Sequence, residues 1–212
     1  MLKRFIPTAW HYALSNLKRS LIGYRKYAQF GEDAVLAELF KDTPRGVYVD
    51  VGAHHPYRYS NTYLLYKKGW HGINIDPNPH TIALFEKARP QDKNICCGVG
   101  AAGTLTYHQF SDPAVNTFVP AEAQKWKGKS FLTFLGTREV EVKPLSALVD
   151  GPVDLLTVDA EGMDLEVLQS YDWRYVPRVV VIEGERSHGF LTQKGYHLHA
   201  RRGLSNIYTH AT

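Results

Sequence analysis

The stretch GVYVDVGAHHPYRYSNTYLLYKKGWHGINIDPNP, from Gly46 to Pro79, decides the fold. It begins with an apolar segment rich in β-branched residues that ends at a glycine, which predicts a buried strand. SNTYLLYKKG then predicts a helix that Ser60 caps and Gly69 stops. HGINIDPNP predicts a second strand, which ends at Asp76. A strand, a helix and a strand in this order predict a unit of a parallel sheet.

The same alternation continues along the chain. Further strands are predicted at residues 93–100 (KNICCGVG), 153–162 (VDLLTVDAEG) and 177–185 (PRVVVIEGE), with a terminal pair of strands at 195–210. Helices are predicted within residues 27–40, 80–90 and 163–173. The fold class is therefore α/β, with a mostly parallel sheet flanked by helices.

The middle of the chain interrupts this pattern. Residues 102–111 alternate in the manner of a strand at the edge of a sheet. Residues 112–137 show no strong period and carry three lysines and several aromatic residues, which indicates a lid or a substrate loop. Residues 138–150 resume with a strand and a short helix. We expect residues 111–137 to shape the site of the substrate.

Length and composition describe one ordinary globular domain. The chain has 212 residues, of which 44% are hydrophobic and 22% charged, which suffices for one well-buried core. No apolar run reaches the ~20 residues of a membrane span, and the N-terminus shows no secretory signal pattern. The two cysteines, Cys96 and Cys97, are neighbours and predict no disulfide. A cytoplasmic location is therefore expected.

The N-terminal part of the chain is basic. The first acidic residue is Glu32, and six lysines and arginines precede it among apolar residues. We predict a basic helical arm over residues 1–26 and one domain over residues 27–212. The arm either packs on the domain or contacts anionic lipid or a phosphorylated carrier, which would place the protein peripherally at the inner membrane surface. No nucleic-acid module accompanies the charge, so no nucleic-acid partner is expected. A homo-oligomer is a possible assembly of the chain.

Acidic residues stand where the predicted strands end. They are Asp50, Asp76, Asp159, Glu161, Glu183 and Glu185. Packing alone does not explain them, because an unpaired buried charge is costly. In an open parallel sheet, ligands bind beyond the carboxyl ends of the strands. These acids therefore predict a binding site at that edge.

The loop after the first strand indicates a nucleoside cofactor. Asp76 follows Asp50 by 76 − 50 = 26 positions, and an acid at this place can accept both hydroxyls of a ribose. Gly52 permits close approach of a ligand. VGAHHP has only one glycine, and Pro56 lacks an amide donor, so the loop does not fit a pyrophosphate. S-adenosylmethionine fits this loop better than NAD does. The alternative is that neither aspartate binds a cofactor, with Asp50 capping a helix and Asp76 forming a turn.

Five segments together resemble the FkbM-type S-adenosylmethionine-dependent methyltransferases. They are YAQFGEDAVLAELF (27–40), YVDVGAHHPYRYSNTYLLYKKGWHGINIDPNP (48–79), DPAVNTF (112–118), DLLTVDAEGMDLEVLQSYDW (154–173) and VVVIEGE (179–185). The first loop departs from the commoner family form, which carries Asn at the position of His54 and Gly at that of Pro56. GAHHP is similar to a variant in bacterial members linked to surface polysaccharides.

The resemblance implies a Rossmann-like class I methyltransferase fold with a seven-stranded sheet whose last strand is antiparallel. It also implies which residues bind the cofactor. By position these are Asp50, Gly52 and Ala53 at the methionine end, Asp76 at the ribose with Pro77 and Asn78 beside it, Cys97 and Gly98 near the adenine, Gln29 and Glu32 closing over the cofactor, and Asn61 and Asp159.

Methylation of a hydroxyl needs a base or a metal ion, because a sugar hydroxyl does not ionise unaided at neutral pH. In one scheme, Asp159 or Glu161 is the base. In the other, Asp159 and Glu183 hold Mg²⁺, which binds the substrate hydroxyl and lowers its pKa. His55 and its neighbour His54 are further candidates for the base, with a surface hydrogen-bonding role as the alternative.

Three functions follow from these observations. The first is an S-adenosylmethionine-dependent O-methyltransferase that acts on a hydroxyl, most simply of a sugar in a surface polysaccharide, a glycolipid or a glycosylated natural product. The second is a nucleotide-linked oxidoreductase, which the missing glycines disfavour. The third is a non-catalytic cofactor-binding module of a glycan-assembly complex. The presence of Asp50, Gly52, Asp76 and Asp159 argues against the third.

Overall fold

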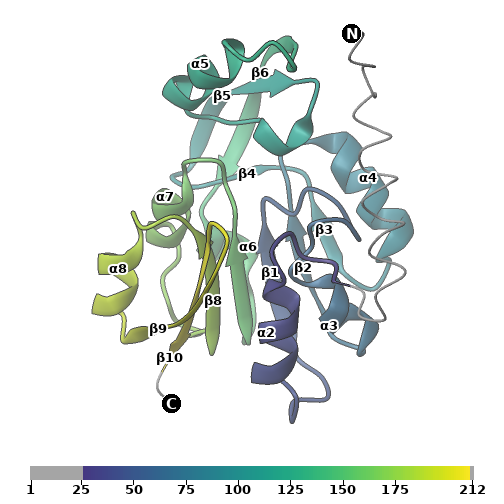
Figure 1. Ribbon diagram of the computed structural model, residues 1–212, viewed down its shortest axis with the longest axis vertical. Coiled ribbons are helices and arrows are strands. Elements are labelled where there is room, and N and C mark those ends of the chain that lie inside the picture. Colours follow the sequence, from purple (N-terminus) through teal and green to yellow (C-terminus); the bar gives the residue numbers. More distant parts are fainter. Residues whose placement is uncertain (1–25, 211–212) are drawn as a thin grey trace, which may run out of the picture.

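The computed structural model describes residues 26–210, which form a central sheet with helices on both faces (Figure 1). The strands of the main sheet are β1 (Val47–Val51), β2 (His71–Ile75), β3 (Lys93–Ile95), β7 (Leu155–Val158), β8 (Val179–Glu183), β9 (Tyr196–Arg202) and β10 (Ser205–His210). The helices that flank it are α2 (Glu32–Leu39), α3 (Tyr63–Lys67), α4 (Pro79–Ala88), α6 (Leu145–Leu148), α7 (Asp164–Gln169) and α8 (His188–Gln193).

The strand order of the main sheet is β3-β2-β1-β7-β8-β10-β9. Strands β1, β2, β3, β7 and β8 run parallel, and β10 runs antiparallel to both of its neighbours. The order reverses between β1 and β7, which is where an open α/β sheet forms its ligand crevice. The predicted fold class and the antiparallel last strand are both confirmed.

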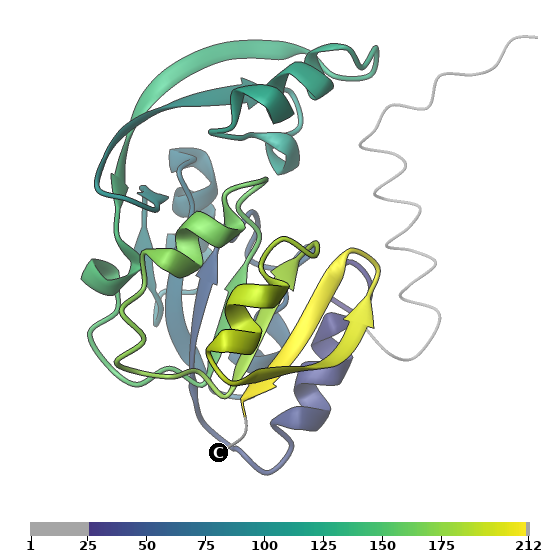
Figure 2. The same cartoon turned by 90° about the vertical axis from the view of Figure 1, so that its left-hand side faces the viewer.

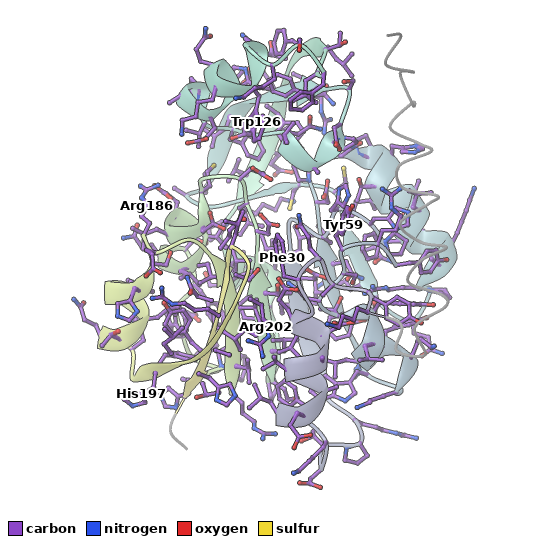
Figure 3. All side chains as sticks on the ribbon, viewed as in Figure 1. Phe30, Tyr59, Trp126, Arg186, His197 and Arg202 are labelled. Carbon is purple, nitrogen blue, oxygen red and sulfur yellow. The ribbon has the colours of Figure 1, made fainter. Side chains whose placement is uncertain are left out.

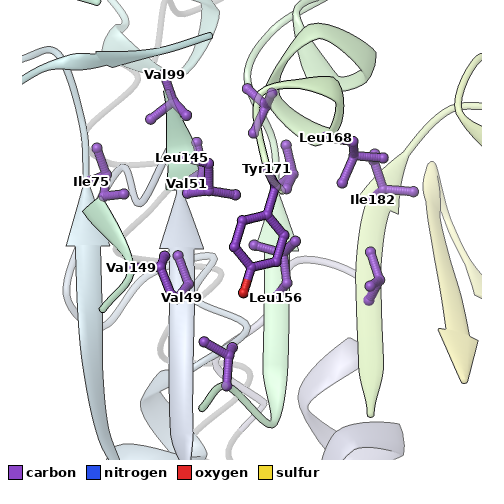
Figure 4. Close-up of a cluster of buried hydrophobic side chains, with 14 of the residues drawn as sticks. Val49, Val51, Ile75, Val99, Leu145, Val149, Leu156, Leu168, Tyr171 and Ile182 are labelled. Atoms are coloured by element: carbon purple, nitrogen blue, oxygen red, sulfur yellow. The ribbon is translucent and has the colours of Figure 1, made fainter. Parts of the chain in front are cut away.

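The two faces of the main sheet pack against different helices, because successive side chains of a strand point to opposite faces. On one face, Val49 and Leu156 belong to a core cluster with side chains of α6, α7 and α8 (Figure 4). On the other face, Leu155 packs with Leu36 of α2 and Leu65 of α3. Both faces are therefore buried, which explains why the central strands are apolar without alternation.

A second sheet begins where one longer strand was predicted. Residues 93–100 are two strands: β3 ends at Ile95, and β4 (Gly98–Val99) leaves the main sheet to pair with β6 (Phe134–Lys143). Close packing favours this path, because a Cβ at Gly98 would lie 2.9 Å from the Phe118 ring. The prediction of a single third strand over these residues is wrong.

The second sheet has the order β4-β6-β5, with β5 (Gly103–Phe110) antiparallel to β6. The predicted edge strand is thus confirmed, in this smaller sheet. The segment between β5 and β6 contains the 3₁₀ helix η1 (Pro113–Val115) and the helix α5 (Pro120–Lys127). Residues 98–143, which we call the cap, arch over the carboxyl edge of the main sheet (Figure 2).

Between residues 26 and 210, no helix has the length and apolar character needed to cross a bilayer. The predicted arm lies outside the described residues except for Lys26. Its structure and its contact with a membrane therefore stay predictions, as does the domain boundary beside it.

Candidate active site

A cavity of about 350 Å³ lies between the carboxyl edge of the main sheet and the cap. It falls in the size range of sites that hold small molecules and cofactors. Residues of the cap and of the main sheet both line it. Among the lining residues that Figure 3 labels, Trp126 of α5 lies in the cap and Tyr59 lies below the cap. The site is therefore assembled from segments that are far apart in the sequence.

Most of the predicted site residues line this cavity. They are Gln29, Asp50, Gly52, Ala53, Asn61, Asp76, Pro77, Cys97, Gly98, Asp159, Glu161 and Glu183. They converge because the carboxyl ends of β1, β2, β7 and β8 meet at the same edge of the sheet. The structure thus brings together the strand-end acids, apart from Glu185, which pairs with Arg201 at 2.9 Å.

Three predicted site residues lie outside the lining and hold the backbone around it. Glu32 is buried and accepts hydrogen bonds from the amide of Phe30 and the hydroxyl of Ser205. Asn78 caps α4 by accepting from the amide of His80. The Nδ1 atom of His55 accepts from the amides of Tyr57 and Arg58 at 3.1 and 3.2 Å. Each of these side chains fixes a turn beside the cavity.

Of the two adjacent histidines, His54 is the one that lines the cavity. Its backbone lies in the left-handed region, with φ 53°, a conformation that non-glycine residues adopt rarely and often at functional sites. Burial lowers the pKa of both imidazoles, that of His55 to about 4. Both rings are therefore neutral near pH 7.

Gly52 lets the loop after β1 pass against the end of β7. Its φ is +74°, and a Cβ there would lie 1.8 Å from the backbone oxygen of Asp159. We expect Gly52→Ala to destabilise the fold by about 3 kcal/mol or more, measured by urea denaturation. Gly189→Ala in α8 is the control, since a Cβ there meets nothing within 4 Å and should change stability by no more than ~1 kcal/mol. Equal stability of both variants would contradict the close approach at Gly52.

Asp76 joins the loops that follow β1 and β2. Its Oδ2 atom accepts from the amide of His54 at 3.0 Å, and its Oδ1 atom accepts from the amide of Asn78 at 2.8 Å. Burial raises its pKa to about 6, against the effect of these two bonds. Each carboxylate oxygen keeps capacity for a second donor. Asp76 can therefore accept both hydroxyls of a ribose.

Three carboxyl groups, Asp159, Glu161 and Glu183, surround the other end of the cavity. Desolvation inside the cavity and repulsion from neighbouring carboxyl groups raise the pKa of each of them, that of Glu161 to about 8. A hydrogen bond with Asp159 acts in the opposite direction on Glu183 and lowers its pKa. Two carboxyl groups can form such a hydrogen bond only when one of them is protonated, and the opposite effects on the two groups place the proton on Asp159.

The cap holds Glu161 in place through its backbone. Glu161 has φ 47°, and its carbonyl oxygen accepts a hydrogen bond from Thr117 Oγ1 at 2.8 Å. Thr117 in turn pairs with His108 of β5 by two backbone hydrogen bonds. The strained backbone at Glu161 is thus supported from the cap, which is the pattern expected of a residue kept for chemistry.

The lining of the cavity is acidic. Within the described part of the chain, five carboxyl groups line it and no lysine or arginine does. Such a site favours a cation and opposes the negative charge of a pyrophosphate. Its carboxyl groups therefore fit S-adenosylmethionine, which carries a sulfonium and an ammonium group.

For a metal ion the fit is poorer. Over residues 26–210, no group of three or more His, Cys, Asp and Glu side chains is arranged to hold one. Asp159 and Glu183 share a hydrogen bond instead. Mg²⁺ at these two residues stays a prediction.

Several residues of the site carried no signal in the sequence. Tyr59 and Trp126 line the cavity, and Tyr59 has φ 55° and stacks on the ring of His54 at 6.2 Å. Asn116 lines it as well and accepts from the amide of Phe110 at 2.7 Å. Asn116 and Trp126 lie within residues 111–137, which were expected to shape the substrate site, but neither residue was singled out.

The chain was compared with known proteins and structures. No curated protein matched its sequence. Among solved structures, it resembles an FkbM methyltransferase from Methylobacillus flagellatus KT (16% identity, TM-score 0.47), covering 79% of this chain and 44% of that one. A TehB-like SAM-dependent methyltransferase from Corynebacterium glutamicum matches over 96% of this chain and 98% of its own (15% identity, TM-score 0.46). At these identities and scores, neither similarity informs on the substrate.

The sequence also matches the family model described as the methyltransferase FkbM domain, over residues 50–206. This match spans most of the chain and includes the end of β1, the cap and the strand-end acids of the cavity. It confirms the resemblance drawn from the motifs. The chain therefore belongs to the FkbM methyltransferase family, and S-adenosylmethionine is the methyl donor that this membership implies.

Proposed function

We propose that this protein transfers the methyl group of S-adenosylmethionine to a hydroxyl oxygen, most simply of a sugar in a polysaccharide, a glycolipid or a glycosylated natural product. The observation that carries the proposal is the acidic cavity, lined by five carboxyl groups and, among described residues, by no lysine or arginine. A cationic cofactor suits this lining, and a deprotonating carboxylate suits a hydroxyl acceptor.

The cofactor would lie along the carboxyl edge of the sheet. Asp76 at the end of β2 would accept hydrogen bonds from the two ribose hydroxyls. Its existing bonds from the two loop amides would stay in place. Asp50 of β1 would face the ammonium group of the methionine end. Cys97, just before the cap, and Gly98, its first residue, would contact the adenine. These places follow the order of strand ends along the sheet.

Methyl transfer is an in-line displacement, and the bound cofactor supplies a methyl group already activated on sulfur. The protein aligns the acceptor oxygen with the carbon–sulfur bond. The bound cofactor would keep the electron pair of its broken carbon–sulfur bond, and Glu161 would accept the proton of the acceptor hydroxyl. Glu161 suits this role because its pKa of about 8 makes it a stronger base than an ordinary carboxylate.

The cap would form the acceptor side of the site. Trp126 of α5 and Asn116 after η1 line the cavity together with Tyr107 of β5. An indole face offers apolar contact to the C–H groups of a sugar ring, while an amide and a phenol offer hydrogen bonds to its hydroxyls. This combination supports a glycan over a purely apolar acceptor.

The alternatives fare less well against the same cavity. A nucleotide-linked oxidoreductase would have to bind an anionic pyrophosphate in an acidic site. A non-catalytic module would have no use for a carboxyl group whose pKa is raised to about 8 beside the cofactor position. Both would lack methyl transfer altogether.

The test is transfer of a radiolabelled methyl group from S-adenosylmethionine to a panel of acceptors. The panel holds free glycans, glycolipids and glycosylated small molecules, and matched acceptors that offer only amines or carboxylates. Label in an ether linkage on a sugar is the expected result. Label on amines or carboxylates alone would contradict O-methylation. A parallel series with EDTA tests the metal, because turnover that survives chelation excludes a required Mg²⁺.

A further inference from the structure

Arg89, which directly follows α4, is a fully buried cation, with an exposed fraction of 0%. Its guanidinium donates to the carbonyl oxygen of Pro56 and, at 2.8 Å each, to the hydroxyls of Ser60 and Thr62. The rings of Phe85, Tyr63 and Tyr66 lie 5.0–5.4 Å from it. The charge is therefore enclosed by aromatic faces and hydrogen-bond acceptors, next to the loop that follows β1.

No ion pair within 4 Å joins Arg89 to a carboxylate in the described chain. Instead, one hydroxyl connects it to the cavity. Thr62 Oγ1 receives the Nη1 hydrogen of Arg89 at 2.8 Å and lies 2.7 Å from Asp50 Oδ2. Arginine has donors and no acceptor, so the Thr62 hydroxyl accepts from Arg89 and keeps its single hydrogen for another partner. The carboxylate of Asp50 at 2.7 Å is a closer and stronger acceptor for it than Ser60 Oγ at 3.3 Å. The direction of the chain from Arg89 through Thr62 to Asp50 is thus fixed.

We propose that Arg89 and Thr62 are positioning residues that keep Asp50 an ionised acceptor for the ammonium group at the methionine end of the cofactor. This inference rests on the proposed function, which places that group beside Asp50. It goes beyond it by assigning a role to two residues that the cavity lining does not include. Neither residue touches the reacting atoms, and both act through Asp50.

The electrostatic surroundings of Asp50 explain why such support is needed. The charged groups that act on it are Arg89 and Asp92 from the end of α4 and beyond, Asp76 from the end of β2, and Asp159 from the end of β7. Arg89 is the only cation among them. Burial and the other carboxyl groups favour the protonated form of Asp50, whereas the bond from Thr62 and the charge of Arg89 oppose it.

The expected effect is a loss of cofactor affinity that depends on pH. Thr62→Val keeps the shape of the side chain and removes the hydroxyl, so the pKa of Asp50 should rise from about 6 toward neutral pH. Binding of S-adenosylhomocysteine should weaken about eightfold at about pH 5.5 and about twofold near pH 7, and the midpoint of its pH dependence should move up by about one unit. Thr62→Ser, which keeps the hydroxyl, should bind within about threefold of the unaltered protein.

A double-mutant cycle separates this role from simple loosening of the loop. Affinity is measured by calorimetry between about pH 5.5 and about pH 8.5 for Thr62→Val, Asp50→Asn and both together. In the Asp50→Asn background, Thr62→Val should have little further effect. Equal losses in both backgrounds, or equal affinity of Thr62→Val and Thr62→Ser, would overturn the inference and leave the proposed function intact.

Two further outcomes keep the test decisive. If the unaltered protein binds no S-adenosylhomocysteine at any pH, the proposed function and the inference both fall. If Thr62→Val does not fold, carbon NMR titration of Asp50 in the unaltered protein decides. A midpoint at about 6 supports the inference, and a carboxyl group that is still protonated above pH ~7 overturns it.

Discussion

Replacing Glu161 by Gln is expected to lower kcat by about 10²- to 10⁴-fold, the usual range for loss of a general base. The amide cannot take the acceptor proton, while its shape still fits the turn that Thr117 supports. In the unaltered enzyme, kcat should rise with pH through the pKa of Glu161, about 8, because only the ionised carboxylate accepts a proton. The variant should lose this rise.

The matched control is Glu86→Gln, which makes the same chemical change at an exposed position of α4. It should leave both kcat and its pH dependence unchanged. Affinity for S-adenosylhomocysteine should change little in Glu161→Gln, which separates chemistry from binding. A Glu161→Gln enzyme that keeps its rate and its pH profile would assign the base to another residue, with Asp159 and His54 next in line.

The same substitution should stabilise the protein at alkaline pH. The pKa of Glu161 is higher in the folded chain, about 8, than its ordinary value of 4.5, so the folded state binds more protons between these values. The free energy of unfolding should therefore fall as pH rises from about 4.5 to about 8. Glu161→Gln removes this contribution, and urea denaturation at both ends of the range measures the difference.

Replacing Asp76 by Ala is expected to weaken binding of S-adenosylhomocysteine by about 100-fold or more. Two charge-assisted hydrogen bonds to the ribose are lost, each contributing about 1.5–3 kcal/mol. Asp150→Ala is the control, because that carboxylate is 88% exposed and contacts Lys93 only at 3.6 Å. Calorimetric titration of the three proteins gives the comparison.

Asp76 also holds the amides of His54 and Asn78, so a direct role in ribose binding needs a second measurement. An analogue of S-adenosylhomocysteine that lacks both ribose hydroxyls should bind the unaltered protein weakly. The Asp76→Ala variant should bind this analogue and S-adenosylhomocysteine itself with about equal affinity. If Asp76→Ala still discriminates between the two compounds, the ribose hydroxyls contact other residues.

The main sheet was predictable because its strands are short, apolar and end in acids or glycine. Both faces of these strands are buried by helices, so the pattern of β1 and β7 is distinct in the sequence. The branch at Cys96 was not predictable. KNICCGVG is continuously compatible with a strand, and only tertiary packing of Gly98 against Phe118 and Val142 directs the chain into the second sheet.

The site was predictable where chemistry follows directly from a strand end. Asp50, Asp76 and Asp159 meet in the cavity because parallel strands end at one edge. The pair of Arg89 and Thr62 was missed, because these two residues lie 27 positions apart in the chain. In addition, a basic residue at the end of a helix is usually read as a helix cap. The sequence also did not show which of His54 and His55 lines the cavity. His54, which does, has a φ of 53° that no sequence pattern predicted.

Calorimetric titration of the protein with S-adenosylhomocysteine, with NAD⁺ as the matched control, shows directly whether this cavity holds the methyl donor. The acidic cavity predicts micromolar binding of S-adenosylhomocysteine and no binding of NAD⁺, whose pyrophosphate the carboxyl groups repel. Binding of NAD⁺ alone, or of neither compound, would contradict the central claim that this cavity holds the methyl donor.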